Sequence, residues 1–502
     1  MLAVLSRERI VAAPGFNRWL IPPCALAIHL CIGQAYAFSV FKLPLTRVVG
    51  VTAPGAADWT QPQLAWVFTI AIVALGLSAA VFGKWVERAG PRRSGVTAAA
   101  LWSAGFLISA LGVHLHAIAL LYLGYGVIGG CGLGIGYITP VSTLIKWFPD
   151  RRGLATGMAI MGFGGGAFVA GPLSQRLMER FAGPDDVGVA PTLLVLGGVY
   201  FVVMMVGALG FRLPPGGHAT GATTGATPAG GGHHVSPSRA IRTPQFYLLW
   251  GVLCLNVTAG IGVIEQASPM IQELFGGRID PPAAAGFVGL LSLFNIGGRF
   301  VWSSLSDRIG RKRTYACFFT LGPALYLALP WTGEHGSVIG FVVAAAAILT
   351  MYGGGFATIP AYLADLFGTQ FVGAIHGRLL TAWSAAGVAG PWLVNHLRQS
   401  QIDAGVAPTR AYTVVLQLMA ALLVLGFVLN ALVRDVASRH HMSAGELEHE
   451  RRTRGADLPR PASTRERPEA ASWRVIAAWL AAGAPLTWGI VQTARGVAAM
   501  FR

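Results

Sequence analysis

Long apolar runs alternate with short polar segments along almost the whole chain. Each run extends over about 20 residues, the length that an α-helix needs to cross the hydrocarbon core of a bilayer. None shows the alternating ten-residue pattern of membrane-barrel strands. We therefore predict an all-α integral membrane protein with twelve spans and a thirteenth near its C-terminal end. The spans are expected near 20–42, 62–82, 95–113, 117–146, 153–176, 191–211, 246–270, 283–305, 315–331, 337–366, 371–396, 411–433 and 473–494.

Composition supports lipid as the surrounding solvent. Of the 502 residues, 54% are hydrophobic and only 12% are charged, whereas an average soluble domain carries about a quarter of charged residues.

The net charge is +16, and the distribution of the basic residues along the chain indicates the membrane topology. With the N-terminus in the cytoplasm, most Lys and Arg residues fall in segments on the cytoplasmic side, which is the positive-inside pattern. We therefore predict a multi-pass protein of the bacterial inner membrane, with a cytoplasmic N-terminus and no nucleic-acid partner. The basic segments are the loops around 84–93, 146–152, 212–242 and 308–313 and the tail 434–474.

A segment rich in Gly, Thr, Ala and Pro divides the apolar runs into six and six. It holds too little apolar surface to fold, so we interpret it as a cytoplasmic linker. The expected organisation is an N-terminal six-helix bundle (1–212), the linker (213–243), a C-terminal six-helix bundle (244–435), a basic cytoplasmic linker (436–472) and an additional transmembrane helix (473–502).

The two halves repeat at a nearly constant offset. GKWVERAGPRR (83–93) matches SSLSDRIGRKR (303–313), GIGYITP (134–140) matches GGGFATIP (353–360), and AGPL (170–173) matches AGPW (389–392). Three matches in one order, at offsets of 219 or 220 positions, indicate a duplicated six-helix unit with a pseudo-two-fold axis. Parallel repeats of this kind place a substrate site near the midplane between the halves.

The charged loops after spans 2 and 8, the 6+6 repeat and the long central loop resemble the major facilitator superfamily. A carboxylate at a helix end, set against several Arg and Lys residues, can form charge-assisted hydrogen bonds that break and re-form during alternating access. The alternative is that these charges only set the topology. The candidate gating residues are Glu87, Arg88, Asp307, Arg308 and Arg311.

WFPDRRGLATGMA (147–159), LFNIGGR…SDRIGRKR (293–313) and ADLFGT (364–369) are similar, more specifically, to the oxalate/formate antiporter family, which includes lactate and pyruvate carriers. The likeness covers roughly residues 17–435. WLAAGAPLTWGIVQT (479–493) is similar to a small hydrophobic subunit found beside some of these carriers, here fused. A thirteenth span would place the C-terminus outside.

Arg299 lies inside an apolar run, eight residues before Asp307. A charge at mid-bilayer costs about 2.5–3.5 kcal/mol on insertion scales. Asn295 is four residues earlier, on the same helix face, so the pair offers a guanidinium fork and an amide to a carboxylate. The alternative is a structural Arg bonded to helix carbonyls or a buried acid. The resemblance also implies a substrate-binding Arg at this position, whereas its repeat-mate is Ala79.

Trp383 stands where the resemblance implies a second cation, a lysine, in oxalate exchangers. Two cations suit a small dianion and one suits a monoanion, because a dianion would leave about one negative charge unpaired in a low dielectric. This favours a monocarboxylate.

Aromatic residues and histidines complete the candidate site. The resemblance implies that Tyr36, Tyr137, Phe163, Tyr352 and Phe356 form an aromatic cage, although aromatic residues in membrane helices also serve as packing. His29 and His376 are candidates for proton coupling because histidine titrates near neutral pH; packing histidines are the alternative.

The sequence therefore predicts a secondary transporter of small monocarboxylate anions, of the formate, lactate or pyruvate type, that works as a monomer by proton symport or anion exchange. The second candidate is an oxalate:formate antiporter. Cation or drug efflux would require a buried acid in the cavity, and a sensor would bind without transport. We expect no enzyme, cofactor or metal site, since no paired carboxylates, nucleophile–base set or metal cluster is evident.

Overall fold

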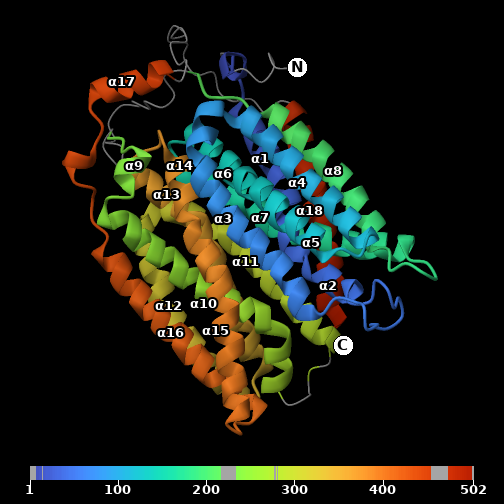
Figure 1. Cartoon of the computed structure of the whole chain (residues 1–502). Coiled ribbons are helices and arrows are strands. Elements are labelled where there is room, and N and C mark those ends of the chain that lie inside the picture. The colour runs from blue at the N-terminus through green and yellow to red at the C-terminus, as the bar shows by residue number, and fades with distance from the viewer. Residues whose placement is uncertain are drawn as a thin grey trace.

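The computed structural model describes residues 7–13, 15–215, 233–275, 279, 281–453 and 473–499, and these residues form helices and connecting loops (Figure 1). Large parts of the predicted linkers 213–243 and 436–472 lie outside the described residues. The described end of the first linker is not extended chain in solvent: the Val235 N–H donates to the Phe367 carbonyl at 3.0 Å, and the short helix α9 (Pro237–Ala240) follows.

Two groups of helices build the molecule. The first group is α1 (Ile21–Ile32), α2 (Ser39–Leu45), α3 (Gln61–Ala89), α4 (Pro91–His114), α5 (Ile118–Leu121), α6 (Gly130–Trp147), α7 (Arg152–Phe181) and α8 (Val189–Gly210). The second is α10 (Pro244–Leu274), α11 (Pro281–Ile309), α12 (Arg311–Glu334), α13 (Val338–Phe367), α14 (Val372–Leu379), α15 (Thr381–Asp403) and α16 (Pro408–Leu432). Two further helices, α17 (Ala444–Thr453) and α18 (Trp473–Ala499), follow.

Ten helical segments of the described chain are long and apolar enough to cross a membrane, and α18 is one of them. The predicted spans near 283–305, 315–331 and 371–396 also form helices, namely α11, α12 and α14 with α15, but they are less apolar. In α11 the reason is visible in the sequence, because Asn295, Arg299 and several serines interrupt the apolar residues.

The repeat in the sequence is a repeat in the structure. α3, α4 and α6 of the first group correspond in order to α11, α12 and α13 of the second. The loops that follow α3 and α11 turn on Gly90 and Gly310, whose φ angles are 83° and 90°. A side chain is strained at such an angle, which explains why both copies of the loop keep a glycine there.

The first span is not one regular helix. A 3₁₀ turn, Gly33–Ala37, separates α1 from α2. At the break, a Cβ atom on Gly33 would lie 2.2 Å from the Phe163 carbonyl oxygen, so the backbones of the first span and α7 approach more closely than a side chain allows. Similarly, the span predicted at 117–146 contains a π-helical segment, Tyr122–Gly129.

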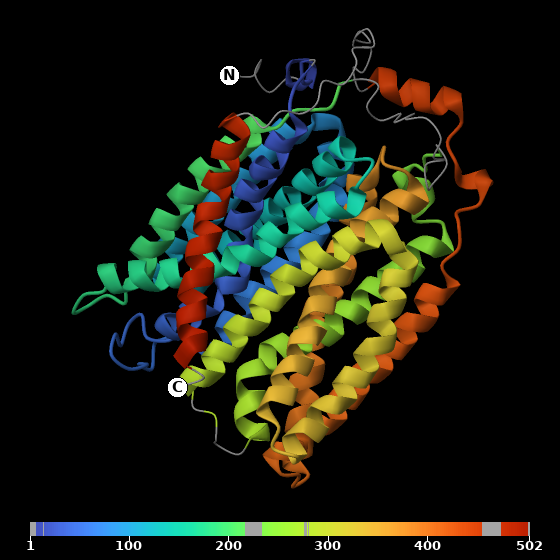
Figure 2. The ribbon, with the colours of Figure 1, turned by 180° about the vertical axis from the view of Figure 1, so that it is seen from behind.

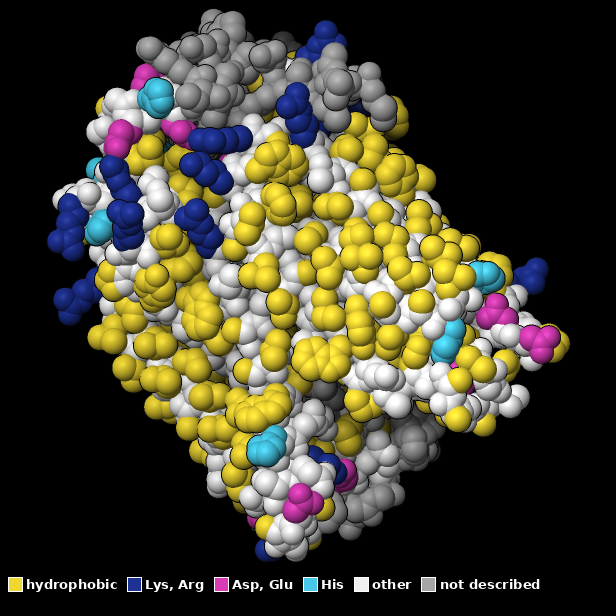
Figure 3. All heavy atoms as spheres, viewed as in Figure 1, with side chains coloured by type: hydrophobic (Ala, Val, Ile, Leu, Met, Phe, Trp, Pro, Cys, Tyr) yellow, Lys and Arg dark blue, Asp and Glu magenta, His cyan; other side chains and the backbone are white. Residues whose placement is uncertain are grey.

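We call the end of the bundle that carries the loops 84–93, 146–152 and 308–313 the basic end. Lys and Arg side chains gather there, near α9, α14 and α17, whereas apolar side chains cover the flanks (Figure 3). The two groups of helices contact each other through α3 against α14 and α15, and through α7 against α11. These contacts extend from Gly83 beside Ala374 to the Ser384 hydroxyl, which donates to the Ile72 carbonyl at 2.7 Å.

The additional helix α18 lies along the bundle, against α1, α7 and α11 (Figure 2). Near the basic end, the Trp479 indole N–H donates to the Trp19 carbonyl at 3.1 Å. Near the other end, the Arg176 guanidinium donates to the Gln492 amide oxygen at 3.2 Å and stacks over the Trp488 ring at 5.0 Å. α18 therefore runs parallel to α7 and touches both halves of the repeat.

Candidate substrate site between the two halves

Arg299 is fully buried in α11 although it is charged. Its Nε donates to the Asn295 amide oxygen at 3.1 Å, and its Nη1 donates to the Ile160 carbonyl of α7 at 3.3 Å. The predicted pairing with Asn295 is therefore present, but the amide oxygen is occupied by the guanidinium. A Cβ on Gly164 would lie 3.0 Å from Nε, so α7 approaches the guanidinium through a glycine.

Aromatic rings from both halves surround this cation. The Arg299 guanidinium carbon lies 5.9 Å from the Phe163 ring centroid and 5.5 Å from that of Phe356, within the range of cation–π attraction. Trp383 is completely buried and packs against Phe356 at 4.6 Å and Phe163 at 5.5 Å. Tyr137 packs against Phe163, Phe356 and Trp383 at 5.3–5.9 Å.

Tyr36 and Tyr352 lie at the margin of this group. Tyr36 packs edge-on against Phe163, with 5.0 Å between ring centroids, and faces Trp383 at 6.3 Å. Tyr352 is buried with its ring against Gly260 of α10, and the adjacent Gly353 packs against Asn295 and Arg299. The structure thus brings together all the residues predicted for the substrate site, from spans of both halves.

Four buried donors in this group have no hydrogen-bond partner among the described residues. They are Nη2 of Arg299, the hydroxyls of Tyr36 and Tyr137, and the indole N–H of Trp383. Such groups are rare in proteins, because an unpaired buried polar atom costs about 1–3 kcal/mol. No carboxylate of the described chain pairs with Arg299. The unmatched groups are donors, which is the set that an anion would satisfy.

The two candidate histidines differ in their surroundings, although both are fully buried. Nδ1 of His29 lies 2.5 Å from the Ala159 carbonyl oxygen, and Nε2 lies 3.1 Å from the Tyr137 carbonyl oxygen. Neither ring nitrogen of His376 has a partner within the described residues. The His376 ring packs against the Tyr137 ring, with 5.9 Å between the ring centroids.

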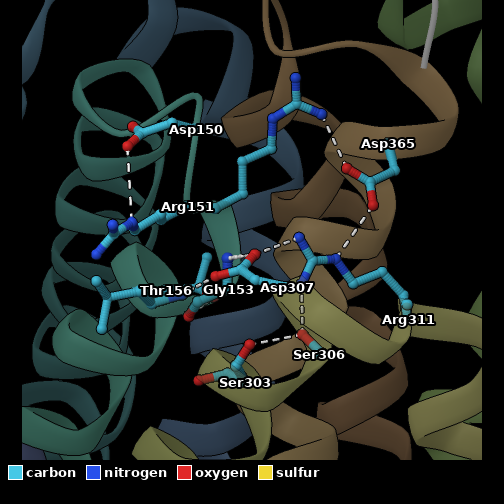
Figure 4. Close-up of polar contacts among 12 residues, drawn as sticks. Asp150, Arg151, Gly153, Thr156, Ser303, Ser306, Asp307, Arg311 and Asp365 are labelled. Atoms are coloured by element: carbon cyan, nitrogen blue, oxygen red, sulfur yellow. Dashed lines mark hydrogen bonds and ion pairs between the residues drawn. The ribbon is translucent and has the colours of Figure 1, made fainter. Parts of the chain in front are cut away.

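Asp307 connects the two halves at the basic end (Figure 4). Its carboxylate accepts from the backbone N–H groups of Gly153 and Leu154, both at 2.8 Å, in the first turn of α7. Arg311 holds the same carboxylate from its own half at 2.6 Å. A carboxylate at a helix N-terminus satisfies open N–H groups and interacts favourably with the helix dipole.

Glu87, the repeat-mate of Asp307, makes the equivalent contact in the opposite direction. Its carboxylate accepts from the Gly373 N–H at 2.9 Å, in the first turn of α14. Lys146 of α6 forms an ion pair with the other oxygen of this buried carboxylate. Each half therefore contributes one acid that caps a helix of the other half.

The remaining two predicted gating residues, Arg88 and Arg308, lie in other surroundings. Arg88 faces α17, where it lies 3.6 Å from Glu450, and Arg308 is exposed without an ion pair among the described residues. Asp365 is not among the gating residues predicted from the sequence. It binds Arg152 of α7 at 2.8 Å and Arg311 at 3.1 Å, which adds a third link across the halves. The opposite charges of Asp365 and Lys146, which are repeat-mates, were the available signal.

The helices are long and apolar enough to cross a membrane, they form two repeated halves, and a buried cation lies between the halves. These features are those of a polytopic membrane transporter. The model of the Major Facilitator Superfamily matches residues 24–391 and again 279–500, and the chain belongs to this family.

Known relatives of the chain include carriers of small anions. The chain is similar to the Oxalate:formate antiporter of Oxalobacter formigenes, with 27% identity over 74% of the chain and 83% of that protein. It is also similar to human Monocarboxylate transporter 11, with 26% identity over 77% of the chain and 78% of that protein. The structure of the Escherichia coli fucose:proton symporter superposes with a TM-score of 0.59 at 15% identity, covering 82% of the chain and 98% of the symporter. That likeness concerns the fold alone.

Proposed function

We propose that the protein carries small monocarboxylate anions, of the formate, lactate or pyruvate type, across the bacterial inner membrane by alternating access. The transport is proton symport or anion exchange, and the N-terminus is cytoplasmic. The observation that carries the proposal is the buried Arg299, which has an open Nη2 and no paired carboxylate among the described residues.

The site offers one carboxylate what it needs. Arg299 supplies the positive charge and a free N–H pair, and the Tyr137 hydroxyl and Trp383 indole supply further donors. The rings of Phe163 and Phe356 then enclose the small apolar remainder of the anion. Because a single cation neutralises a single carboxylate, a monoanion leaves no excess charge in the low-dielectric site.

The contacts at the basic end supply the gate. Asp307 and Glu87 each bind N–H groups of a helix that belongs to the opposite half. Separation of the halves at this end requires these bonds to break, and water replaces the lost partners there. The acids therefore stabilise the arrangement that is closed at the basic end, without preventing its opening.

A second candidate is oxalate:formate exchange, which the similarity to the Oxalobacter formigenes protein favours. Under this alternative Arg299 alone would serve a dianion, since Trp383 occupies the position expected for a second cation.

Uptake into proteoliposomes separates the two candidates. Labelled lactate, formate and oxalate are offered with and without an inward proton gradient to wild type, Arg299→Lys, Arg299→Gln and, as a control, Arg308→Gln at an exposed position. We expect lactate or formate uptake that Arg299→Gln abolishes and that Arg299→Lys reduces, because lysine keeps the charge but loses the bidentate fork. Arg308→Gln should match wild type.

Oxalate uptake that requires internal formate would establish the exchanger instead. Carboxylate uptake that persists in Arg299→Gln would show that Arg299 is structural.

A further inference from the structure

His29 lies in the last turn of α1 and makes an unusual pair of contacts. The ring is fully buried, stacks on Tyr137 at 5.3 Å with an interplanar angle of 19°, and meets Phe163 edge-on at 6.3 Å. Its two nitrogens face two backbone carbonyl oxygens, one from α7 (Ala159, 2.5 Å) and one from α6 (Tyr137, 3.1 Å).

A carbonyl oxygen can only accept a hydrogen bond, and a neutral imidazole carries only one N–H. In the neutral form, therefore, the lone pair of one ring nitrogen would face a carbonyl oxygen at hydrogen-bond distance. The imidazolium form donates from both nitrogens and satisfies both contacts. His376, the other buried histidine near the site, has no acceptor on either nitrogen within the described chain, so nothing there favours its second proton.

One of the carbonyl groups that contact His29 and the carbonyl group that accepts from Arg299 belong to consecutive residues of α7. His29 Nδ1 faces the Ala159 oxygen, and Arg299 Nη1 donates to the oxygen of the next residue, Ile160. Charged or titratable groups act on His29 from three packed elements: Tyr137 of α6, Arg299 of α11 and His376 of α14. Arg299 is the permanent charge among them, and it opposes a second cation at His29.

We propose that His29 is the proton-binding group of the carrier and that it takes up its proton together with the anion that binds Arg299. This inference rests on the proposed function, and it selects symport over simple exchange. The proton enters from water onto a ring nitrogen, is held by the two carbonyls, and returns to water on the other side when the anion leaves.

The coupling follows from charge. Without substrate, the burial of His29 away from water favours the neutral ring, and the repulsion between Arg299 and a protonated His29 adds to this. A carboxylate bound to Arg299 cancels that repulsion, so anion and proton each strengthen the binding of the other by the same factor. Acidic pH therefore increases the affinity for the anion, and anion binding draws a proton from solution.

The test compares His29→Gln with His376→Gln and Arg299→Gln in proteoliposomes. Two readouts are taken for each variant: net lactate uptake driven by an inward proton gradient, and exchange of labelled against unlabelled lactate without a gradient. In His29→Gln we expect gradient-driven uptake to fall about tenfold, within the usual 5–150-fold range of site coupling, while exchange persists. His376→Gln should retain both activities, and Arg299→Gln should lose both.

Gradient-driven lactate uptake that survives undiminished in His29→Gln would overturn the inference. This result leaves the proposed function intact, because that function fails only if wild type carries no monocarboxylate.

A measurement on wild type covers the case in which His29→Gln does not fold. Lactate is added to the purified protein in weakly buffered detergent solution near neutral pH, and the change in pH is recorded. Uptake of up to about one proton per bound anion supports the inference, because the anion then raises the proton occupancy of a single group. Anion binding without proton uptake, and with an affinity independent of pH, would contradict it.

Discussion

At the scale of single residues, the asymmetry between Arg299 and Ala79 shows how a repeated fold acquires one binding site. Ala79 holds the position of Arg299 in the first half, but its carbonyl oxygen lies 2.2 Å from where a Cβ of Gly377 would stand. α3 and α14 are in backbone contact at that point, and Ala79 is fully buried. A long cation has no room there, whereas α7 leaves room for Arg299 through Gly164.

Trp383 is expected to decide how many negative charges the site accepts. Trp383→Lys introduces a second cation into the ring cluster of Tyr137, Phe163 and Phe356, where an unpaired ammonium is costly. A dianion would pair with both Arg299 and the new lysine. We therefore predict that Trp383→Lys gains oxalate uptake relative to formate, by about tenfold or more, since close charge pairs in buried sites contribute about 1.5 kcal/mol or more.

The matched control is Trp383→Gln, which removes the same ring without adding charge. If both variants shift the ratio of oxalate to formate equally, the size of the cavity rather than its charge selects the substrate.

Sequence reasoning identified the charged candidate by a residue type that is costly in a membrane, and the aromatic candidates by resemblance to a family. Arg299 could be identified as a candidate binding residue because a lone cation inside an apolar span is energetically costly. The partners of these residues could not, since Ala159, Ile160 and Tyr137 contribute backbone carbonyls to His29 and Arg299. A backbone contact leaves no trace in residue type. It depends on how closely two helices approach.

At the scale of helices, the first turns of α7 and α14 carry the contact between the halves. Both turns have open N–H groups, and each receives a carboxylate from the other half. The sequence indicated the acids but not their targets. The spans themselves were well predicted from apolar length, whereas the 3₁₀ turn at Gly33–Ala37 depends on the approach of α7 and was not.

Removal of the Asp307 cap should loosen the basic end. Asp307→Ala leaves two N–H groups of α7 without their acceptor, and loss of an N-cap typically costs about 0.5–2 kcal/mol. The population open at the basic end should therefore rise by about 2- to 30-fold. Labels at the exposed positions Arg151 and Arg313, one in each half, would report the change as a longer mean distance.

Arg308→Ala serves as the comparison, since Arg308 is on the same loop and exposed. An unchanged distance distribution in Asp307→Ala would mean that the other contacts, Arg152 with Asp365 and Glu87 with α14, are sufficient to hold the basic end closed.

At the scale of the whole molecule, α18 connects parts that alternating access would move apart. It contacts α7 in one half and α11 in the other. Leu486 lies within 2.4 Å of where a Cβ on Gly165 would be, and the adjacent Gly164 faces Arg299. Only the width of α7 therefore separates α18 from the proposed site. The sequence predicted a thirteenth span but contained no pattern that shows where it docks.

The role of this contact can be tested with two glycines of the same helix. A Cβ on Gly489 would meet the Phe168 carbonyl oxygen of α7 at 2.8 Å, whereas a Cβ on Gly483 would meet nothing within 4 Å. Gly489→Val should therefore push α18 away from α7, while Gly483→Val makes the same chemical change on an open face.

Because α18 packs on both halves in the arrangement closed at the basic end, its displacement removes stabilisation from that arrangement. We predict that Gly489→Val lengthens the Arg151–Arg313 label distance and changes the maximal rate of lactate uptake, with little effect on affinity, and that Gly483→Val matches wild type. Equal behaviour of the two variants would show that α18 binds to the bundle without stabilising the arrangement that is closed at the basic end.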